Sequence, residues 1–216
     1  MHNTVKNLIY IEELIKSKAN HDELAKIIAV SKTFPIENVL PLIEHGHLHY
    51  GENKVQEALD KWSDIKLKNN AIKLHLIGRL QTNKVKFALK IFDYIHSLDS
   101  ERLAIKISEE EIKQGKNPKI FIQVNIGNED QKSGINKDNL VDFYKFCKNL
   151  NLDIIGTMCI PPNEGNVEKY FSEMSDLNKE LNFKELSMGM SGDYLEAIRY
   201  NATYIRIGSK IFGSRT

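Results

Sequence analysis

The sequence predicts a single α/β domain: a (β/α)8 barrel of the TIM type with one extra helix at its N-terminus. Short apolar stretches and amphipathic stretches alternate eight times along the 216 residues, and no linker or low-complexity segment interrupts them. Regular alternation of strand and helix indicates a parallel sheet, and eight such units close most naturally into a barrel. A doubly wound open sheet is the alternative, although no Gly-x-Gly-x-x-Gly follows the first strand to favour its dinucleotide-binding form. We therefore predict one domain over residues 1–216.

The first twenty residues are predicted to form a helix that packs on the barrel. Leu8, Ile11, Leu14 and Ile15 recur at helical spacing, with charged side chains between them. These charges interrupt the stretch too often for a secretion signal or a membrane span, and no other stretch reaches the apolar length that a bilayer requires. We therefore expect a cytoplasmic protein that does not contact a membrane.

The first strand and the helix after it are recognisable by their ends. The run Ile27 to Val30 predicts a short buried strand, and Pro35 opens a helix over residues 37–45 that Gly46 ends. Seven further strands are predicted at residues 47–53, 74–78, 94–98, 119–125, 153–160, 185–190 and 204–208. The helices between them are predicted at residues 55–65, 85–91, 101–115, 140–150, 167–181 and 194–200.

A single lysine, Lys32, stands at the end of the first predicted strand. Because side chains alternate along a strand, Ile28, Val30 and Lys32 share one face, which in a parallel barrel is the interior face. A lysine in that position needs an anionic partner or must give up its charge. A neutral amine near a carbonyl is the reagent of Schiff-base chemistry. The alternative is a fully solvated lysine at a strand exit.

Polar residues follow several of the predicted strands. In a barrel, the C-terminal ends of all strands open at one mouth, which is where active sites of this fold lie. The side chains that we expect to converge there are Lys32, Asn53, Arg79, Asn125 and Ser191.

The last two strands end in loops that are suited to an anion. Ser191 can cap the helix that follows the seventh strand, which leaves backbone N–H groups of the first turn facing a ligand. After the eighth strand, Gly208 permits close backbone approach and Ser209 offers a hydroxyl. Phosphates frequently bind to these two loops in barrels. The alternative is an ordinary capped helix followed by an ordinary strand exit.

Composition narrows the class of ligand. With 30 Lys and Arg residues against 29 Asp and Glu residues, the chain has no basic footprint for nucleic acid, which favours a small molecule. Cys147 and Cys159 have no metal-type spacing and are predicted to be packing residues. His45, His47 and His49 lack the carboxylate or cysteine that would complete a metal shell. The run of glutamates at 109–111 predicts a solvated helix face.

Seven motifs resemble those of the pyridoxal phosphate homeostasis protein family, and they occur in family order between residues 29 and 213. They are Ala-Val-Ser-Lys-Thr (29–33), Gly-Glu-Asn (51–53), Leu-His-Leu-Ile-Gly-Arg-Leu-Gln-Thr-Asn-Lys (74–84), Lys-Ser-Gly (132–134), Gly-Thr-Met (156–158), Leu-Ser-Met-Gly-Met-Ser-Gly-Asp (186–193) and Ile-Arg-Ile-Gly-Ser-Lys-Ile-Phe-Gly (205–213). Each motif is weak alone, but seven in order are specific. The resemblance implies a barrel similar to the N-terminal domain of alanine racemase.

The resemblance also implies a cofactor, pyridoxal 5'-phosphate (PLP), held as an internal aldimine by Lys32. By position, Ser191, Gly208 and Ser209 hold the phosphate, Arg206 faces the pyridine nitrogen, and Asn53 lies near the ring or the aldimine. Three further residues are expected as walls of the pocket, namely His75, Met158 and Asn125. The family's common threonine after Arg-Ile-Gly is replaced here by Ser209, which keeps the hydroxyl.

Three functions remain open on the sequence. The first is a non-catalytic PLP protein for storage, protection and delivery, with apo PLP-dependent enzymes as partners. The second is a racemase-like enzyme. Racemisation needs a second acid or base opposite Lys32; with only eight residues after Gly208 we do not expect a further domain to supply it, which leaves a partner subunit as its source. The third is a Schiff-base aldolase, for which Glu52 is the candidate carboxylate. The predicted outer helices show no long apolar seam, so we expect a monomer.

Overall fold

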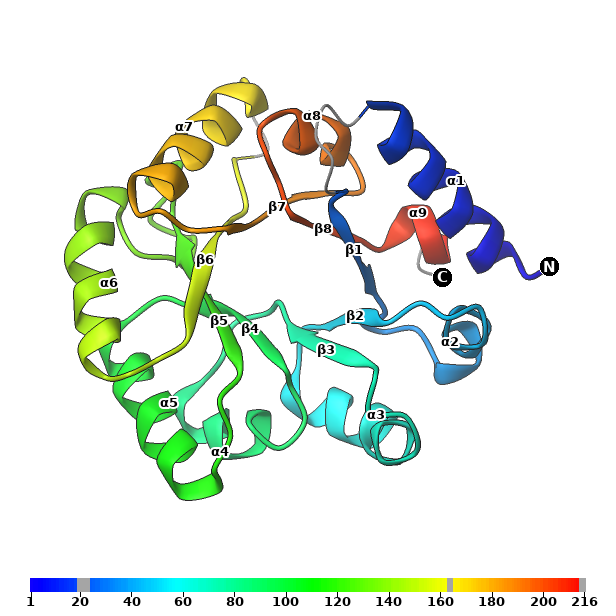
Figure 1. Ribbon diagram of the computed structural model, residues 1–216, viewed down its shortest axis with the longest axis horizontal. Helices are drawn as coiled ribbons and strands as arrows, with labels where there is room; N and C mark the ends of the chain where they lie inside the picture. The colour runs from blue at the N-terminus through cyan, green and yellow to red at the C-terminus, as the bar shows by residue number, and fades with distance from the viewer. Residues whose placement is uncertain (19–23, 163–164, 214–216) are drawn as a thin grey trace.

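The structure is a closed barrel of eight parallel strands in sequence order, from β1 beside β2 around to β8 beside β1 (Figure 1). It is a computed structural model that describes residues 1–18, 24–162 and 165–213. The strands are β1 (Lys26–Val30), β2 (His49–Glu52), β3 (Lys73–Leu76), β4 (Tyr94–Leu98), β5 (Lys119–Val124), β6 (Ile154–Cys159), β7 (Glu185–Met190) and β8 (Tyr204–Ile207). The predicted (β/α)8 barrel is confirmed, and the doubly wound alternative is wrong.

Helices surround the barrel and separate the strands (Figure 1). They are α1 (Asn3–Lys18), α2 (Leu40–Glu44), α3 (Val55–Lys68), α4 (Val85–Ala88), α5 (Glu101–Gln114), α6 (Leu140–Asn149), α7 (Val167–Glu180), α8 (Tyr194–Arg199) and α9 (Ser209–Phe212). The helix predicted at 37–45 is divided into a 3-10 turn (Ile36–Asn38) and α2, because Pro41 fits only the first turn of a helix. The sequence did not predict α9.

The core has two layers, as expected for strands that are covered on both faces. A large cluster lies between the strands and the helices, and a smaller one fills the barrel interior. The residues of the interior cluster are Ile28, Val30, Tyr94, Phe121, Met158 and Tyr204. Ile27 and Ala29, which alternate with Ile28 and Val30, belong to the outer cluster. The strand parity that directs Lys32 towards the interior is therefore confirmed for the residues before it.

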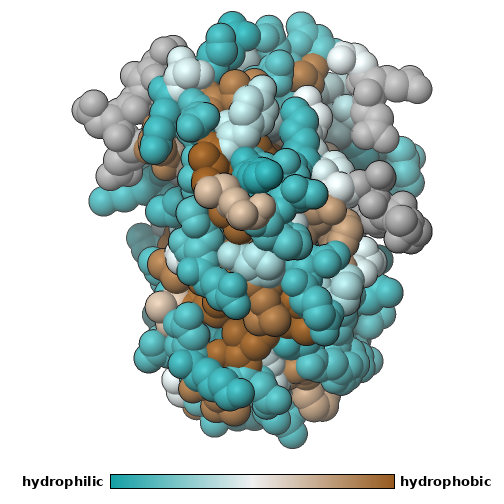
Figure 2. Space-filling model, turned by 90° about the vertical axis from the view of Figure 1, so that its right-hand side faces the viewer, coloured by the Kyte–Doolittle hydropathy of each residue, from teal (hydrophilic) through white to brown (hydrophobic). Residues whose placement is uncertain are grey.

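The N-terminal helix α1 lies against α9, α8 and α2 (Figure 1). Leu8, Ile11 and Ile15 are buried in this contact, as their spacing predicts. Residues 19 and 20 of the predicted helix lie outside the described residues. Figure 2 shows the face on which α1 and α2 lie, where apolar areas are separated by hydrophilic side chains. None of the helices in the described ranges is both long and apolar enough to cross a membrane.

The run of glutamates on α5 is not a solvated face, and the prediction is wrong for two of its three residues. Glu109 is exposed, but Glu110 and Glu111 are only 6% and 7% exposed. Glu110 pairs with Lys106 at 3.1 Å. Glu111 has no such partner, and its Oε1 atom is buried without a hydrogen bond among the described residues. Burial, with a smaller contribution from the nearby Asp153 carboxylate, raises the pKa of Glu111 to about 7.

We expect Glu111 to make stability fall as pH rises. The ordinary pKa of the group is 4.5, so between pH 4.5 and 7 the unfolded chain releases a proton that the folded chain retains. The free energy of unfolding should therefore decrease by ~1–3 kcal/mol across this range and change no further above it. Urea unfolding at several pH values should show that Glu111→Gln removes this decrease, whereas Glu109→Gln keeps it. Identical pH profiles for Glu111→Gln and the wild type would contradict the assignment.

Candidate functional site

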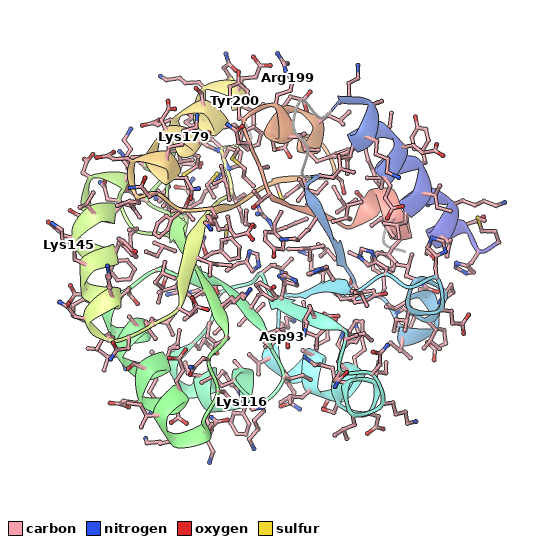
Figure 3. All side chains as sticks on the ribbon, viewed as in Figure 1. Asp93, Lys116, Lys145, Lys179, Arg199 and Tyr200 are labelled. Atoms are coloured by element: carbon pink, nitrogen blue, oxygen red, sulfur yellow. The ribbon has the colours of Figure 1, made fainter. Side chains whose placement is uncertain are left out.

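A cavity of about 520 Å³ opens at the C-terminal ends of the strands. It is lined by Val30, Lys32, Phe34, Asn53, Ile77, Ile160, Met190, Ser191, Gly192, Arg206, Gly208, Ser209 and Gly213. Its size is that of a pocket for a small molecule, with apolar walls and a few polar groups. Charged side chains such as Lys145 and Arg199 point away from the barrel into solvent, so they lie far from this mouth (Figure 3).

The loop that carries Lys32 is held from behind by α3. Lys61 Nζ donates to the Ser31 carbonyl oxygen at 2.8 Å, and the Thr33 N–H donates to Glu57 Oε1 at 2.6 Å. Thr33 has a φ of 67°, a left-handed conformation that is costly for a β-branched residue and needs such support. Lys32 itself is partly buried and lines the cavity. The prediction of a lysine at the barrel mouth is therefore confirmed.

Glu52 points away from the cavity. It is fully buried, and its Oε1 atom accepts hydrogen bonds from Ser31 Oγ at 2.7 Å, Lys61 Nζ at 2.9 Å and Trp62 Nε1 at 3.0 Å. Lys61 and Trp62 belong to α3, on the outer side of the sheet. The carboxylate on which the aldolase interpretation depended therefore supports the strand end and does not reach a ligand beside Lys32.

The loops after β7 and β8 meet at one hydrogen bond. The Gly208 N–H donates to Ser191 Oγ at 3.2 Å. The expectation that Ser191 caps α8 is wrong, because α8 begins after Asp193 without a side-chain cap. Asp193 instead accepts from the Met190 N–H at 2.6 Å and closes the turn. Ser191 is thus free to join the two loops.

Backbone donors accompany these hydroxyl groups. Gly192 and Ser209 both line the cavity, and neither backbone N–H has an acceptor in the described part of the chain. A Cβ atom added at Gly192 would meet nothing within 4 Å, so the backbone there is open to a ligand. Two hydroxyls and two available N–H groups form a donor set that suits an oxyanion such as a phosphate.

Arg206 is buried where it lines the cavity, at 4% exposure. Its Nη1 donates to Ser187 Oγ at 2.7 Å and its Nη2 donates to the Cys159 carbonyl oxygen at 2.8 Å. Burial lowers the pKa of the guanidinium from its ordinary value, but an arginine side chain remains a cation in proteins. Among the described residues no carboxylate forms an ion pair with it.

Several predicted residues do not reach the cavity. His75 and Met158 were expected as walls, but both are fully buried in the barrel interior and neither lines the cavity. Asn125 binds the backbone of Glu129 within its own loop. Arg79 is exposed and also lies outside the lining. The barrel tilts its strands, so residues at equal distance from the strand ends lie at different depths.

Some lining residues were missed by the sequence interpretation. Phe34 stacks on Phe212 of α9, with ring centroids 5.0 Å apart. Ile77 and Ile160 follow β3 and β6 and complete the apolar wall. Their interior parity could have been read from the strands, because each lies two residues beyond an interior position.

Comparisons with known proteins identify relatives of this chain. The family model described as "Alanine racemase, N-terminal domain" matches residues 11–216. A pyridoxal phosphate homeostasis protein from Aquifex aeolicus (strain VF5) is 37% identical over 215 residues, which cover 95% of this chain and 93% of the relative. The protein of the same name from Escherichia coli (strain K12) is 31% identical and covers 100% of this chain and 98% of the relative.

Solved structures show the same fold. PipY of Synechococcus elongatus PCC7942, with PLP bound, has a TM-score of 0.86 and 30% sequence identity, and the match covers 97% of this chain and 100% of that chain. Alanine racemase of Clostridium difficile 630 has a TM-score of 0.75 and 14% identity, covering 99% of this chain and 57% of that one. At that identity the likeness to the racemase concerns the fold alone.

Proposed function

The chain belongs to the pyridoxal phosphate homeostasis protein family, and on this premise we propose that it binds PLP in the cavity and takes part in PLP homeostasis without catalytic turnover. One observation carries the proposal. A primary amine, a set of oxyanion donors and a buried cation line the same cavity, at the ends of the three neighbouring strands β7, β8 and β1. PLP presents an aldehyde, a phosphate and a pyridine nitrogen, which are the groups that this set can bind.

The residues fit the group in their chemistry. Lys32 would hold the aldehyde through its amine, and PLP would supply a carbonyl that can condense with this amine with loss of water. Ser191, Ser209 and the N–H groups beside them bind the phosphate. Gly208, whose N–H is engaged with Ser191, fixes the spacing of these donors. The apolar residues of the lining offer a wall for the ring, and Asn53 adds an amide to the same lining.

Arg206 sets the character of the bound ring. It can only donate hydrogen bonds, so it would hold the pyridine nitrogen as an acceptor and would leave that nitrogen without a proton. A ring in this state is a poorer electron sink than one paired with a carboxylate. Arg206 thereby favours retention of the cofactor over chemistry at a substrate carbon.

Among the residues that the structure describes, the cavity lining offers no second acid or base of the kind a racemase needs. Racemisation requires one group on each face of the substrate carbon. Within the described residues, the ionisable side chains of the cavity are Lys32 and Arg206, and Arg206 cannot accept a proton. This composition, together with relatives named for homeostasis, favours the non-catalytic function over the racemase-like one.

The proposal also covers the partners, the cellular location and the oligomeric state of the protein. A protein that shelters and releases PLP needs recipients, and apo PLP-dependent enzymes are the partners whose chemistry fits. We place it in the cytoplasm, where such enzymes use the cofactor. On the one face that Figure 2 shows, hydrophilic side chains separate the apolar areas and leave no broad apolar surface for a partner. We propose a monomer, built as one domain over residues 1–216.

Proton exchange tests the absence of turnover. Protein loaded with PLP is incubated with L-alanine or L-serine in heavy water, and deuterium at the α-carbon is followed by NMR. We expect no more exchange than free PLP gives at the same concentration. Faster exchange would contradict the non-catalytic function and favour the racemase-like enzyme. A protein that gains no visible absorption when PLP is added would contradict cofactor binding itself.

A further inference from the structure

A continuous line of hydrogen-bonded side chains crosses the barrel interior and ends at Arg206. His49 Nδ1 lies 2.9 Å from His75 Nε2, and His75 Nδ1 lies 2.9 Å from His96 Nε2. His96 Nδ1 lies 2.9 Å from Ser187 Oγ, which accepts from Arg206 at 2.7 Å. These five residues come from β2, β3, β4, β7 and β8, so the line joins more than half of the strands.

The inner members of this line are shielded from water. His75, His96 and Ser187 are fully buried. The His75 ring stacks on Tyr94 with centroids 4.1 Å apart, and the His96 ring stacks on Phe121 at 4.2 Å. Burial lowers the pKa of both imidazoles well below 6.5, with a further contribution from Arg206 for His96. Both rings are therefore neutral at physiological pH.

His49 is the outer end of the line. It is only partly buried, and it lies beside the small surface pocket formed with Leu8 and Glu12. Burial, followed by the charges of Lys26 and Lys73, lowers its pKa to about 4. Because His49 is partly exposed, water can either donate a hydrogen bond to its second ring nitrogen or accept one from it. This end therefore does not fix the direction of the hydrogen bonds, and the other end must set it.

Arg206 sets that direction. A neutral imidazole has one donor and one acceptor, so the line can run in only two senses. Arg206 only donates, hence Ser187 Oγ is its acceptor. The hydroxyl hydrogen of Ser187 then has His96 Nδ1 as its acceptor among the described residues. In the opposite sense, this buried hydroxyl hydrogen would be left unsatisfied, which disfavours that arrangement.

We propose that His96, His75 and His49 form a one-way hydrogen-bond chain, with every hydrogen on Nε2, that orients Ser187 and stabilises the positive charge of Arg206 at the floor of the cavity. They are positioning residues, since none of them lines the cavity. This hydrogen-bond chain would compensate a buried charge. Arg206 is buried without an ion pair in the described part of the protein, and a buried charge requires compensation.

The chain compensates this charge through aligned dipoles. Each member donates to the next one away from Arg206, so the acceptor end of every group faces the guanidinium. Bonds in such a chain polarise one another, which strengthens the bond from Arg206 to Ser187. Two of the five N–H donors of Arg206 are used by Ser187 and Cys159, which leaves the others for a ligand.

Nitrogen NMR of the ligand-free protein tests the direction of the chain. In protein labelled with ¹⁵N-histidine, His96, His75 and His49 are expected as neutral Nε2–H tautomers, and His96 and His75 should not titrate between pH 8 and 5.5. Ser187→Ala should shift the His96 resonances towards a mixture of tautomers. Ser97→Ala is the matched control, because Ser97 is a buried serine beside His96 whose hydroxyl has no partner in the described structure. A His96 that carries its hydrogen on Nδ1, or that titrates in this range, would overturn the proposal.

A second experiment measures how the hydrogen-bond chain affects ligand binding at Arg206. It rests on the proposed function because the ligand is PLP. His96→Phe should stack on Phe121 but cannot hydrogen-bond, so PLP affinity should fall on the order of 10-fold and the absorption maximum should move. His96→Gln, which can accept and donate, should restore most of both. Equal effects of Phe and Gln would contradict a role in hydrogen bonding. If the wild type does not bind PLP, the proposed function fails, but the NMR experiment still tests the hydrogen-bond chain.

Discussion

Replacing Lys32 with alanine is expected to abolish the visible absorption that PLP gives when it is bound to the wild-type protein. Lys32 is the lysine among the described residues that lines the cavity, and the band requires a covalent bond between an amine and the aldehyde. The phosphate donors remain in the variant, so PLP should still bind, but more weakly and with the spectrum of the free aldehyde. Absorbance after addition of PLP and gel filtration measures both.

Two variants control this result. Lys32→Arg keeps a cation at the cavity but not a condensing amine, so it should lack the band as Lys32→Ala does. Lys54→Ala removes an exposed lysine that precedes α3 and should keep the band unchanged. A Lys32→Ala protein that retains the wild-type band would show that another amine holds the cofactor.

Replacing both Ser191 and Ser209 with alanine is expected to produce the second large effect, a loss of PLP affinity of about 10²–10⁴-fold. Each hydroxyl bonded to a phosphate contributes about 1.5–3 kcal/mol, and each 1.4 kcal/mol is a factor of ten in Kd. Ser191 has the additional task of receiving the Gly208 N–H, so its removal also loosens the contact between the two loops. Fluorescence or absorbance titration with PLP measures the change.

A ligand without the phosphate is the control for this pair. Pyridoxal lacks the group that Ser191 and Ser209 bind, so its affinity should differ little between the wild type and the double variant. Ser172→Ala, on α7 and outside the cavity lining, should leave both ligands unaffected. Unchanged affinity for PLP in the double variant would mean that the phosphate lies elsewhere.

The fold and much of the mouth could be predicted from the sequence because local patterns determine them. Strand parity alone directs Ile28, Val30 and Lys32 to one face, and the structure agrees. The alternation of strands and helices fixes which ends share a mouth, so Lys32, Asn53 and Ser191 meet there as expected. Arg206, which only the family resemblance placed at the site, lines the same cavity. Cys147 and Cys159 are both buried, as their spacing suggested.

Contacts between distant residues could not be predicted in this way. His96 and Ser187 are 91 positions apart, and no local pattern joins them. The spacing of His47 and His49 suggests metal ligands, whereas His49 is hydrogen-bonded to His75 on the neighbouring strand β3. The depth of a residue in a tilted barrel depends on the register between strands, which is why His75 was expected in the cavity wall and lies below it.

Errors of a second kind came from competing local partners. Ser191 fits the pattern of a helix cap, but Asp193 closes the turn and Ser191 bonds Gly208 instead. Glu52 is the last residue of β2 and lies near the barrel mouth, where a catalytic carboxylate would be expected. Its side chain nevertheless points to the outer face of the sheet, away from the cavity, and accepts hydrogen bonds from α3. Glu111 belongs to a run of glutamates that predicts a solvated helix face. Its burial results from packing against the rest of the chain, which the local pattern does not show.

The most direct test of the central claim is to identify the lysine that holds PLP. Wild-type protein is loaded with PLP, the covalent bond is fixed by borohydride reduction, and proteolytic peptides are analysed by mass spectrometry. We predict the mass of reduced PLP on the peptide that contains Lys32 and on no other lysine-containing peptide at comparable yield. A label that is absent, or that is found mainly on a lysine outside the cavity, would contradict the account.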